Sequence, residues 1–172
     1  MNRRLVLQGG LALGSALLLS ACGFKLRGAA TYAFDTIAVS ASQNGAVAAE
    51  LRNALGSRLR DSVPTAAGAS ATAPAQVTIE ILQELRERSV AGVNAAGQVR
   101  ELQLRIRVKF RLRNASGKDI IEDTEILQQR DISFNESAVL AKEVEEALLY
   151  RNMQTDIVQQ LLRRLAAVKS IT

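Results

Sequence analysis

Residues 102–113 read LQLRIRVKFRLR. The even positions, from Leu102 to Leu112, are all apolar, and the odd positions from Arg105 to Arg113 are all basic. An alternation with a period of two is that of a β-strand and not of a helix. The stretch therefore predicts a strand with one apolar face, which other elements must cover, and one face of positive charge.

The basic face of this strand allows two interpretations. Charged strand faces are commonly solvated surfaces, in which case acids on a neighbouring strand would balance the cations. The alternative is a surface that binds something anionic. We expect the next strand to neutralise Arg107 and Lys109. The cations without an obvious acidic partner on that strand are Arg105, Arg111 and Arg113.

The composition limits the classes of function. The 172 residues suit one domain, and 48% hydrophobic with 23% charged residues is ordinary for a globular protein. The chain has no His and a single Cys, which excludes imidazole catalysis, the usual zinc sites and an internal disulfide. No group of residues indicates a catalytic site, a metal site or a cofactor, so we predict that the chain is not an enzyme.

Residues 1–21 have the features of a secretory signal peptide. Two arginines precede an apolar run that is too short to span a membrane comfortably. The run ends in Leu-Ser-Ala-Cys at positions 19–22, which resembles a bacterial lipobox. The resemblance implies cleavage before Cys22 and acylation of Cys22 by chains such as palmitate. The alternative is an ordinary signal peptide with a chance cysteine.

Removal of the signal would leave a lipid-anchored chain with a small positive charge. The formal net charge of +5 falls to +3 without Arg3 and Arg4 (20 basic against 17 acidic residues), too small an excess to indicate nucleic acid. Several acyl chains would hold the protein durably to a bilayer. By analogy with enterobacterial lipoproteins, Gly23 in place of Asp after the cysteine favours the outer membrane. Residues 22–34 would then form a lipidated tether.

The rest of the chain divides by periodicity into four strands and two helices. Both prolines fall in residues 63–75, which we interpret as a loop. The expected elements are a strand at 35–41, a helix at 46–62, strands at 76–88, 102–113 and 119–134, and a helix from 136 to about 168, in which a break near Tyr150 is allowed. The order β-α-β-β-β-α predicts an α+β fold, a two-layer sandwich in which a four-stranded sheet carries two helices on one face. A single domain would span residues 35–168, with a tail at 169–172.

The pairing of the strands can be predicted from the same patterns. Asn114 to Gly117 is a hairpin turn signal. We prefer a register with Lys109 opposite Asp123, which leaves Phe110 opposite Glu122.

In the strand at 76–88, the residues expected on one face are Val77, Ile79, Ile81 and Leu85, and those on the other are Glu80, Glu84, Arg86 and Arg88.

The helices carry apolar stripes and candidate caps. Asn44 and Asn135 stand where the two helices would begin and could cap them. The last helix has one stripe at Leu140, Val144 and Leu148, and a further one from Met153 to Val168.

Residues 22–28 read CGFKLRG, which is similar to the Cys-Gly-aromatic-x-Leu-Arg start of the LptE family of LPS-assembly lipoproteins. The resemblance continues through the first strand and helix, Gly97-Gln98, residues 140–143 (LAKE) and residues 161–165 (LLRRL). It implies a non-enzymatic lipoprotein, anchored in the outer membrane and facing the periplasm. Such a protein would form a one-to-one complex with the LptD β-barrel, plug the barrel, assist its assembly and bind lipopolysaccharide.

The resemblance also suggests where lipopolysaccharide binds. Lys142 matches a family lysine implicated in that contact, although a solvated lysine at a helix start is the alternative. The family arginine near the Gly-Gln hairpin has no clean counterpart, because Asn94 and Ala95 occupy the region and the nearest cation is Arg100. Arginine binds phosphate as a bidentate fork. We therefore expect an anion-binding surface formed by Lys142, Arg100, Arg105, Arg111 and Arg113.

Two other functions remain open at this point. One is a stand-alone periplasmic lipoprotein that binds a lipid, which would need an apolar cavity that the tight alternation does not suggest. The other is a scaffold lipoprotein of another envelope complex. Co-purification with a large barrel would separate both from the first interpretation.

Overall fold

The computed structural model describes residues 31–43, 45–60 and 74–171, which belong to one compact unit. The expected signal peptide, Cys22, most of the tether, Asn44 and nearly all of the 63–75 loop lie outside the described residues. The elements in chain order are β1 (Ile37–Ala41), α2 (Ala46–Leu55), the 3₁₀ turn η1 (Gly56–Arg58), β2 (Val77–Val93), β3 (Val99–Asn114), β4 (Asp119–Ser133), η2 (Glu136–Ala138) and α3 (Val139–Ala167).

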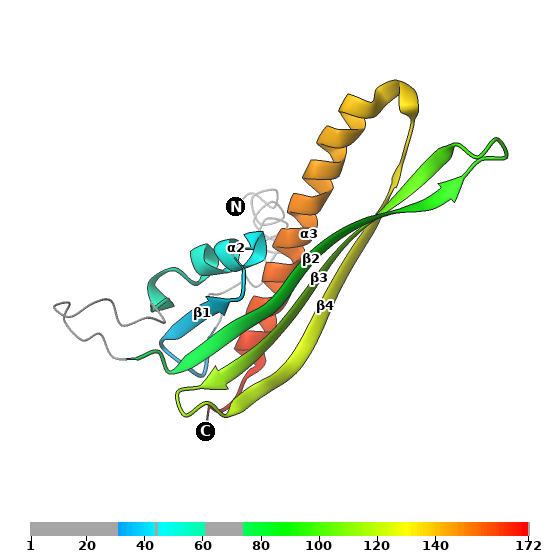
Figure 1. Ribbon diagram of the computed structural model, residues 1–172. Helices are drawn as coiled ribbons and strands as arrows, with labels where there is room; N and C mark the ends of the chain where they lie inside the picture. Colours follow the sequence, from blue (N-terminus) through cyan, green and yellow to red (C-terminus); the bar gives the residue numbers. More distant parts are fainter. Residues whose placement is uncertain (1–30, 44, 61–73, 172) are drawn as a thin grey trace, which may run out of the picture. The chain divides into compact units, whose positions relative to one another are not determined.

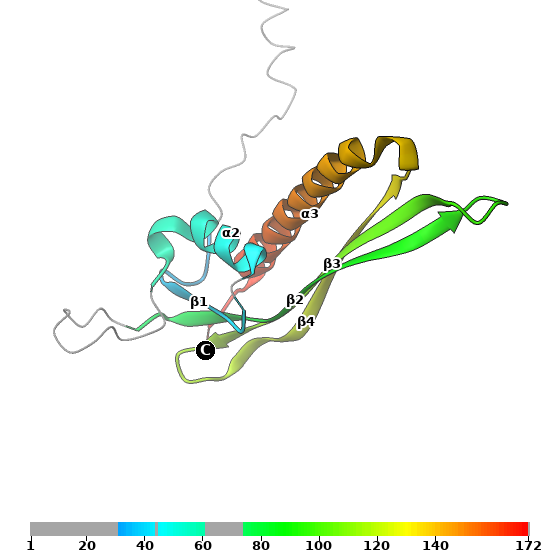
Figure 2. The same ribbon diagram turned by 45° about the horizontal axis from the view of Figure 1, so that its top comes forward.

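The four strands form one sheet in the order β1-β2-β3-β4 (Figure 1). β1 runs parallel to β2, and the other two pairs are antiparallel. Both helices lie on the same side of the sheet, as the two views together show (Figures 1 and 2). The predicted α+β fold and the order β-α-β-β-β-α are therefore confirmed. None of the described helices is both long and apolar enough to cross a bilayer.

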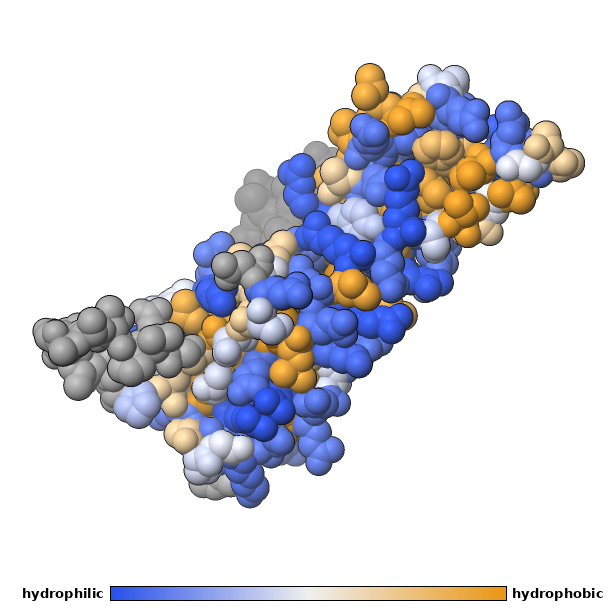
Figure 3. Space-filling view, in the orientation of Figure 1, coloured by the Kyte–Doolittle hydropathy of each residue, from blue (hydrophilic) through white to orange (hydrophobic). Residues whose placement is uncertain are grey.

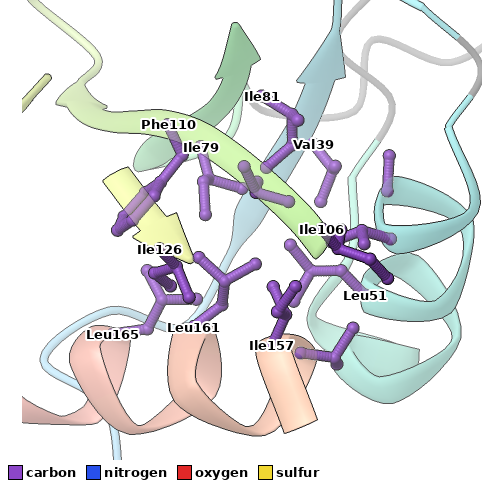
Figure 4. Close-up of a cluster of buried hydrophobic side chains, with 14 of the residues drawn as sticks. Val39, Leu51, Ile79, Ile81, Ile106, Phe110, Ile126, Ile157, Leu161 and Leu165 are labelled. Carbon is purple, nitrogen blue, oxygen red and sulfur yellow. The ribbon is translucent and has the colours of Figure 1, made fainter. Parts of the chain in front are cut away.

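The core lies between the helices and the apolar face of β3. The even positions of β3 from Leu104 to Leu112 are fully buried. α3 contributes Met153, Ile157, Leu161 and Leu165, and α2 contributes Val47 and Leu51 (Figure 4). The covered apolar face that the alternation predicts is thus confirmed.

A β-bulge changes the faces of β2. Ile81 lies opposite Phe110, but Gln83 lies opposite Lys109, so Leu82 is an extra residue in the strand. One extra residue moves every following side chain to the other face. The predicted faces beyond the bulge are therefore wrong: Leu85 points away from the helices. The residues on the helix side are Glu84, Arg86 and Arg88.

The pairing of β3 with β4 differs from the prediction by two residues. Lys109 lies opposite Glu125 rather than Asp123, and Phe110 lies opposite Thr124 rather than a glutamate. A shift of two keeps each side chain on its expected face, because two is the side-chain period of a strand. The observed register also places a small hydroxyl instead of a carboxylate beside the aromatic ring. Irregularities near the turn absorb the difference.

The last helix is continuous, and the apolar stripe of its first half lies outside the core. No break occurs near Tyr150. The side-chain amide oxygen of Asn135 accepts a hydrogen bond from the backbone N–H of Ser137, so the predicted cap is confirmed, although it caps η2. The stripe at Leu140, Val144 and Leu148 is 79%, 72% and 54% exposed. This stripe does not contribute to the core.

Candidate functional site

The basic residues of β3 lie on the outer face of the sheet, where acids from both neighbouring strands meet them. Arg111 lies 2.7 Å from Glu80 of β2 and 3.9 Å from Asp123 of β4. Arg113 pairs with Asp119 of β4 at 2.8 Å, and this hydrogen bond raises the pKa of Arg113. The prediction that these two arginines lack acidic partners on β4 is wrong. The observed register brings both β4 acids within reach, and Glu80 joins them from β2.

The middle of the same face is less fully paired. Arg107 Nε lies 3.7 Å from Glu125 Oε1, an ion pair without a hydrogen bond. Arg105 donates a hydrogen bond to the side chain of Gln103, and the Nε atoms of Arg105 and Arg107 are buried without a hydrogen-bond partner among the described residues. Lys109 is exposed and makes no ion pair with the described residues. Three of the five cations between Arg105 and Arg113 therefore hold ion pairs, which favours the charge-balanced interpretation of this face.

Arg100 and Lys142 both lie at the other end of the sheet. The Nζ of Lys142 donates to Ser133 Oγ at 3.0 Å and lies 2.8 Å from Glu145 Oε2. The carbonyl of Arg100 accepts a hydrogen bond from the backbone N–H of Phe134, the residue after Ser133. The start of β3, the end of β4 and the start of α3 therefore bring these two cations to one region.

The predicted anion-binding residues thus fall into two groups. Arg100 and Lys142 lie at the end of the sheet where β3 begins, and Arg111 and Arg113 lie near the end of the same strand. Arg111 lies eleven positions after Arg100, which is about 36 Å along a strand. Arg105 stands between the two groups. The structure does not bring all five residues into one site.

A second polar region lies between β2 and the first half of α3. Arg86 donates a hydrogen bond to Gln154 at 2.8 Å, and its guanidinium lies 5.6 Å from the centre of the Tyr150 ring. Arg88 Nε lies 3.4 Å from Glu146 Oε2. Together they border a groove of about 440 Å³. The groove is lined by Arg86, Arg88, Glu143, Glu146, Ala147, Tyr150 and Arg151.

Sequence reasoning missed this groove because it placed the two arginines of β2 on the outer face. The signal that could have revealed it is the break in alternation at Ile81-Leu82, where two apolar residues adjoin. The hydroxyl of Tyr150 donates to the carbonyl of Glu87 at 2.7 Å. Burial raises the pKa of Tyr150, and the charge of Glu146 raises it further.

Comparison with known proteins identifies the family. The family model LptE, described as lipopolysaccharide-assembly, matches residues 34–165. This chain belongs to the LptE family. The matched range contains Lys142 and the four arginines Arg100, Arg105, Arg111 and Arg113, whereas Cys22 lies before it. Among curated protein sequences, none matches the chain.

Solved structures of lipoproteins have the same fold. The solution structure of an uncharacterized lipoprotein B from Nitrosomonas europaea is 32% identical, with a TM-score of 0.67 over 84% of this chain and 91% of that one. The rare lipoprotein B of Shewanella oneidensis is 20% identical, with a TM-score of 0.61 over 77% of this chain and 94% of that one. A minor lipoprotein of Acinetobacter baumannii is 18% identical, with a TM-score of 0.59 over 80% of this chain and 94% of that one. The fold of this LptE-family chain is therefore one that lipoproteins adopt.

Proposed function

We propose that this chain is a non-enzymatic outer-membrane lipoprotein. It forms a one-to-one complex with the LptD β-barrel, plugs the barrel and assists its assembly, and it binds lipopolysaccharide during delivery to the cell surface. The observation that carries the proposal is the match of the lipopolysaccharide-assembly family to residues 34–165. The lipoprotein neighbours of the same fold support an anchored protein of the cell envelope.

The anchor of the proposed protein is an acylated Cys22. The Leu-Ser-Ala-Cys end of the signal supports it, and so does the absence of any other cysteine in the chain. In cells that lack the barrel partner, Cys22→Ala should move the protein from the membrane to the soluble fraction, because several buried acyl chains are lost. Fractionation followed by detection of the chain measures this. A variant that stays in the membrane without the barrel would contradict the anchor.

The proposed lipopolysaccharide contacts differ in how many ion pairs they already hold within the protein. Lys142 and Arg100 lie at one end of the sheet, and only Lys142 of the two is held by an acid, its near neighbour Glu145. Arg111 and Arg113 are each held by acids of both neighbouring strands, so a phosphate would have to displace two ion pairs at each of them, compared with one at Lys142. We therefore place the principal contact at Lys142 and Arg100, with Arg105 as the next cation along the strand.

Two measurements on matched variants test this proposal. Lys142→Gln combined with Arg100→Gln should weaken lipopolysaccharide binding by the purified chain, and added salt should weaken the wild-type binding. Arg111→Gln serves as the matched control and should change binding less. Barrel co-purification from cells should persist in both variants. A chain that never co-purifies with a large barrel would contradict the proposed partnership, whatever its lipid binding.

A further inference from the structure

The helix layer covers only part of the sheet. α2 meets α3 where Gln154 Nε2 donates to the carbonyl of Ala46 at 3.2 Å and where Thr155 bonds Glu50. Ala46 is the first residue of α2, so the part of α3 before Gln154 has no neighbouring helix among the described residues. The groove between α3 and β2 lies in this uncovered part.

The groove carries an excess of positive charge that its own contacts do not satisfy. Its lining has three arginines against two glutamates, and among the described residues the ion pair within the groove joins Arg88 and Glu146. Within the described part of the chain, the partners of Arg86 are neutral: an amide oxygen and an aromatic ring. Arg151 makes no ion pair with the described residues and is exposed. One phosphate group, with a charge between −1 and −2, would bring the lining close to neutrality.

An apolar rim borders the charged lining. Val144 and Leu148 precede Ala147 and Arg151 by three residues each, so their stripe runs beside the groove on the helix surface. On the β2 side of the groove, the side chain of Val90 is 56% exposed. Figure 3 shows apolar surface gathered at the end of the molecule where α3 begins and the β2–β3 hairpin turns. Exposed apolar residues grouped in this way mark contact sites rather than ordinary surface.

We propose that this groove binds the phosphate of an anionic lipid, with Arg86 and Arg151 on the phosphate and the stripe of Leu140, Val144 and Leu148 on the acyl chains. A guanidinium pair beside an apolar rim matches an amphiphile with one anionic end. The inference rests on the proposed function, since lipopolysaccharide is a phosphorylated, acylated lipid. It adds a site on the β2 side of α3, whereas Lys142 faces β4.

Short-chain lipids below their micelle concentration test the groove by calorimetric titration of the full mature chain carrying Cys22→Ala. The probes are dihexanoyl phosphatidic acid, inorganic phosphate and dihexanoylglycerol. We expect the phosphatidic acid to bind more tightly than either fragment, because it alone contacts both the arginines and the apolar stripe. Equal affinity for inorganic phosphate would overturn the lipid assignment, and equal affinity for the uncharged lipid would overturn the role of the arginines.

Substitutions in the groove test whether phosphatidic acid binds there. Arg86→Gln with Arg151→Gln should weaken phosphatidic acid binding by roughly tenfold or more, since hydrogen bonds to charged groups are the stronger class. Arg151→Gln alone changes an exposed residue without an ion pair, so it keeps the test valid if the double variant folds poorly. Val144→Gln should weaken binding of the lipid but not of inorganic phosphate. The matched control is Arg163→Gln, an exposed arginine elsewhere on α3.

The outcomes separate this inference from the proposed function. If the Arg151 variant binds the lipid as the wild type does but no longer co-purifies with the barrel, the groove is a protein interface. The inference is then wrong while the proposed function stands. If the groove variants lose the lipid and the barrel complex persists, the inference is supported. Loss of binding in the Arg163 variant as well would show a general charge effect and would contradict the site.

Discussion

Phe110 shows at a single residue how the two faces of β3 differ. Its side chain is fully buried beneath α3 (Figure 4). Its neighbour Lys109 is exposed on the other face. Phe110→Ala should lower the free energy of unfolding by about 3–5 kcal/mol, the usual effect of emptying an aromatic site in a core. Lys109→Ala should change it by no more than about 0.5 kcal/mol. Denaturant titrations of the two variants measure this, and equal losses would contradict the two-faced strand.

Tyr150 gives the groove a measurable pH dependence. Its pKa lies above the ordinary value because of burial and then of Glu146, so the folded state holds the phenol proton more strongly than the unfolded state does. This contribution to stability is present below the unfolded pKa of about 10 and is lost as the pH rises through the folded pKa. Unfolding titrations across this range should show stability falling with pH, and Tyr150→Phe should flatten that fall.

A control for the Tyr150 prediction comes from the only other tyrosine, Tyr32. Tyr32→Phe should leave the alkaline fall in place, because Tyr150 would still titrate. Tyr150→Phe should also lower stability by about 1 kcal/mol at neutral pH, since the hydrogen bond to the carbonyl of Glu87 is lost. A slope that is the same in both variants would show that Tyr150 does not carry the effect.

At the level of elements, α2 depends on a carboxylate from β2. The backbone N–H groups of Ala46 and Val47 each donate to an oxygen of Glu84 at 3.1 Å, and the residue before the helix, Gly45, has no side chain to cap it. The bulge at Leu82 is what turns Glu84 toward the helix. Free N–H groups and the helix dipole at this end both favour a carboxylate.

Removing that carboxylate should weaken α2 specifically. Glu84→Ala should lower the free energy of unfolding by about 0.5–2 kcal/mol, the range for loss of a helix cap. Glu122→Ala, on exposed β4 surface, is the control and should have little effect. Thermal melts of both variants measure the difference. If Glu84→Ala melts as the control does, the cap does not contribute to stability.

The elements also show which features of the structure the sequence could predict and which it could not. Apolar alternation in β3 and four-residue steps in the helices report burial directly, so the fold and its order were predictable. The adjoining apolar residues Ile81 and Leu82 mark a break in the alternation of β2, but which residue is extra depends on the pairing with β3, so β2 alone could not show it. The same bulge hid the groove. Arg100 and Lys142 come together only through the pairing of β3 with β4, which no local pattern contains.

In the molecule as a whole, within residues 31–43, 45–60 and 74–171, the core occupies one part of the sheet. β1 pairs with β2 only up to Ile81, so β2 beyond the bulge has β3 as its single strand neighbour. Its apolar residues there, Val90 and Val93, are 56% and 60% exposed. Local stability follows buried apolar contact and paired backbone. The distal part of the β2–β3 hairpin should therefore open more easily than the part under α3.

Native-state hydrogen exchange tests this difference. Amides of β3 from Leu104 to Leu112 should exchange most slowly, because they lie in the central strand beneath the core and open only in global unfolding. Amides of β2 from Arg86 to Val93 should exchange faster, through local opening. Phe110→Ala should speed exchange in the first set by lowering global stability and leave the second set nearly unchanged. Uniform rates, or equal acceleration of both sets, would mean that the hairpin and the core open as one unit.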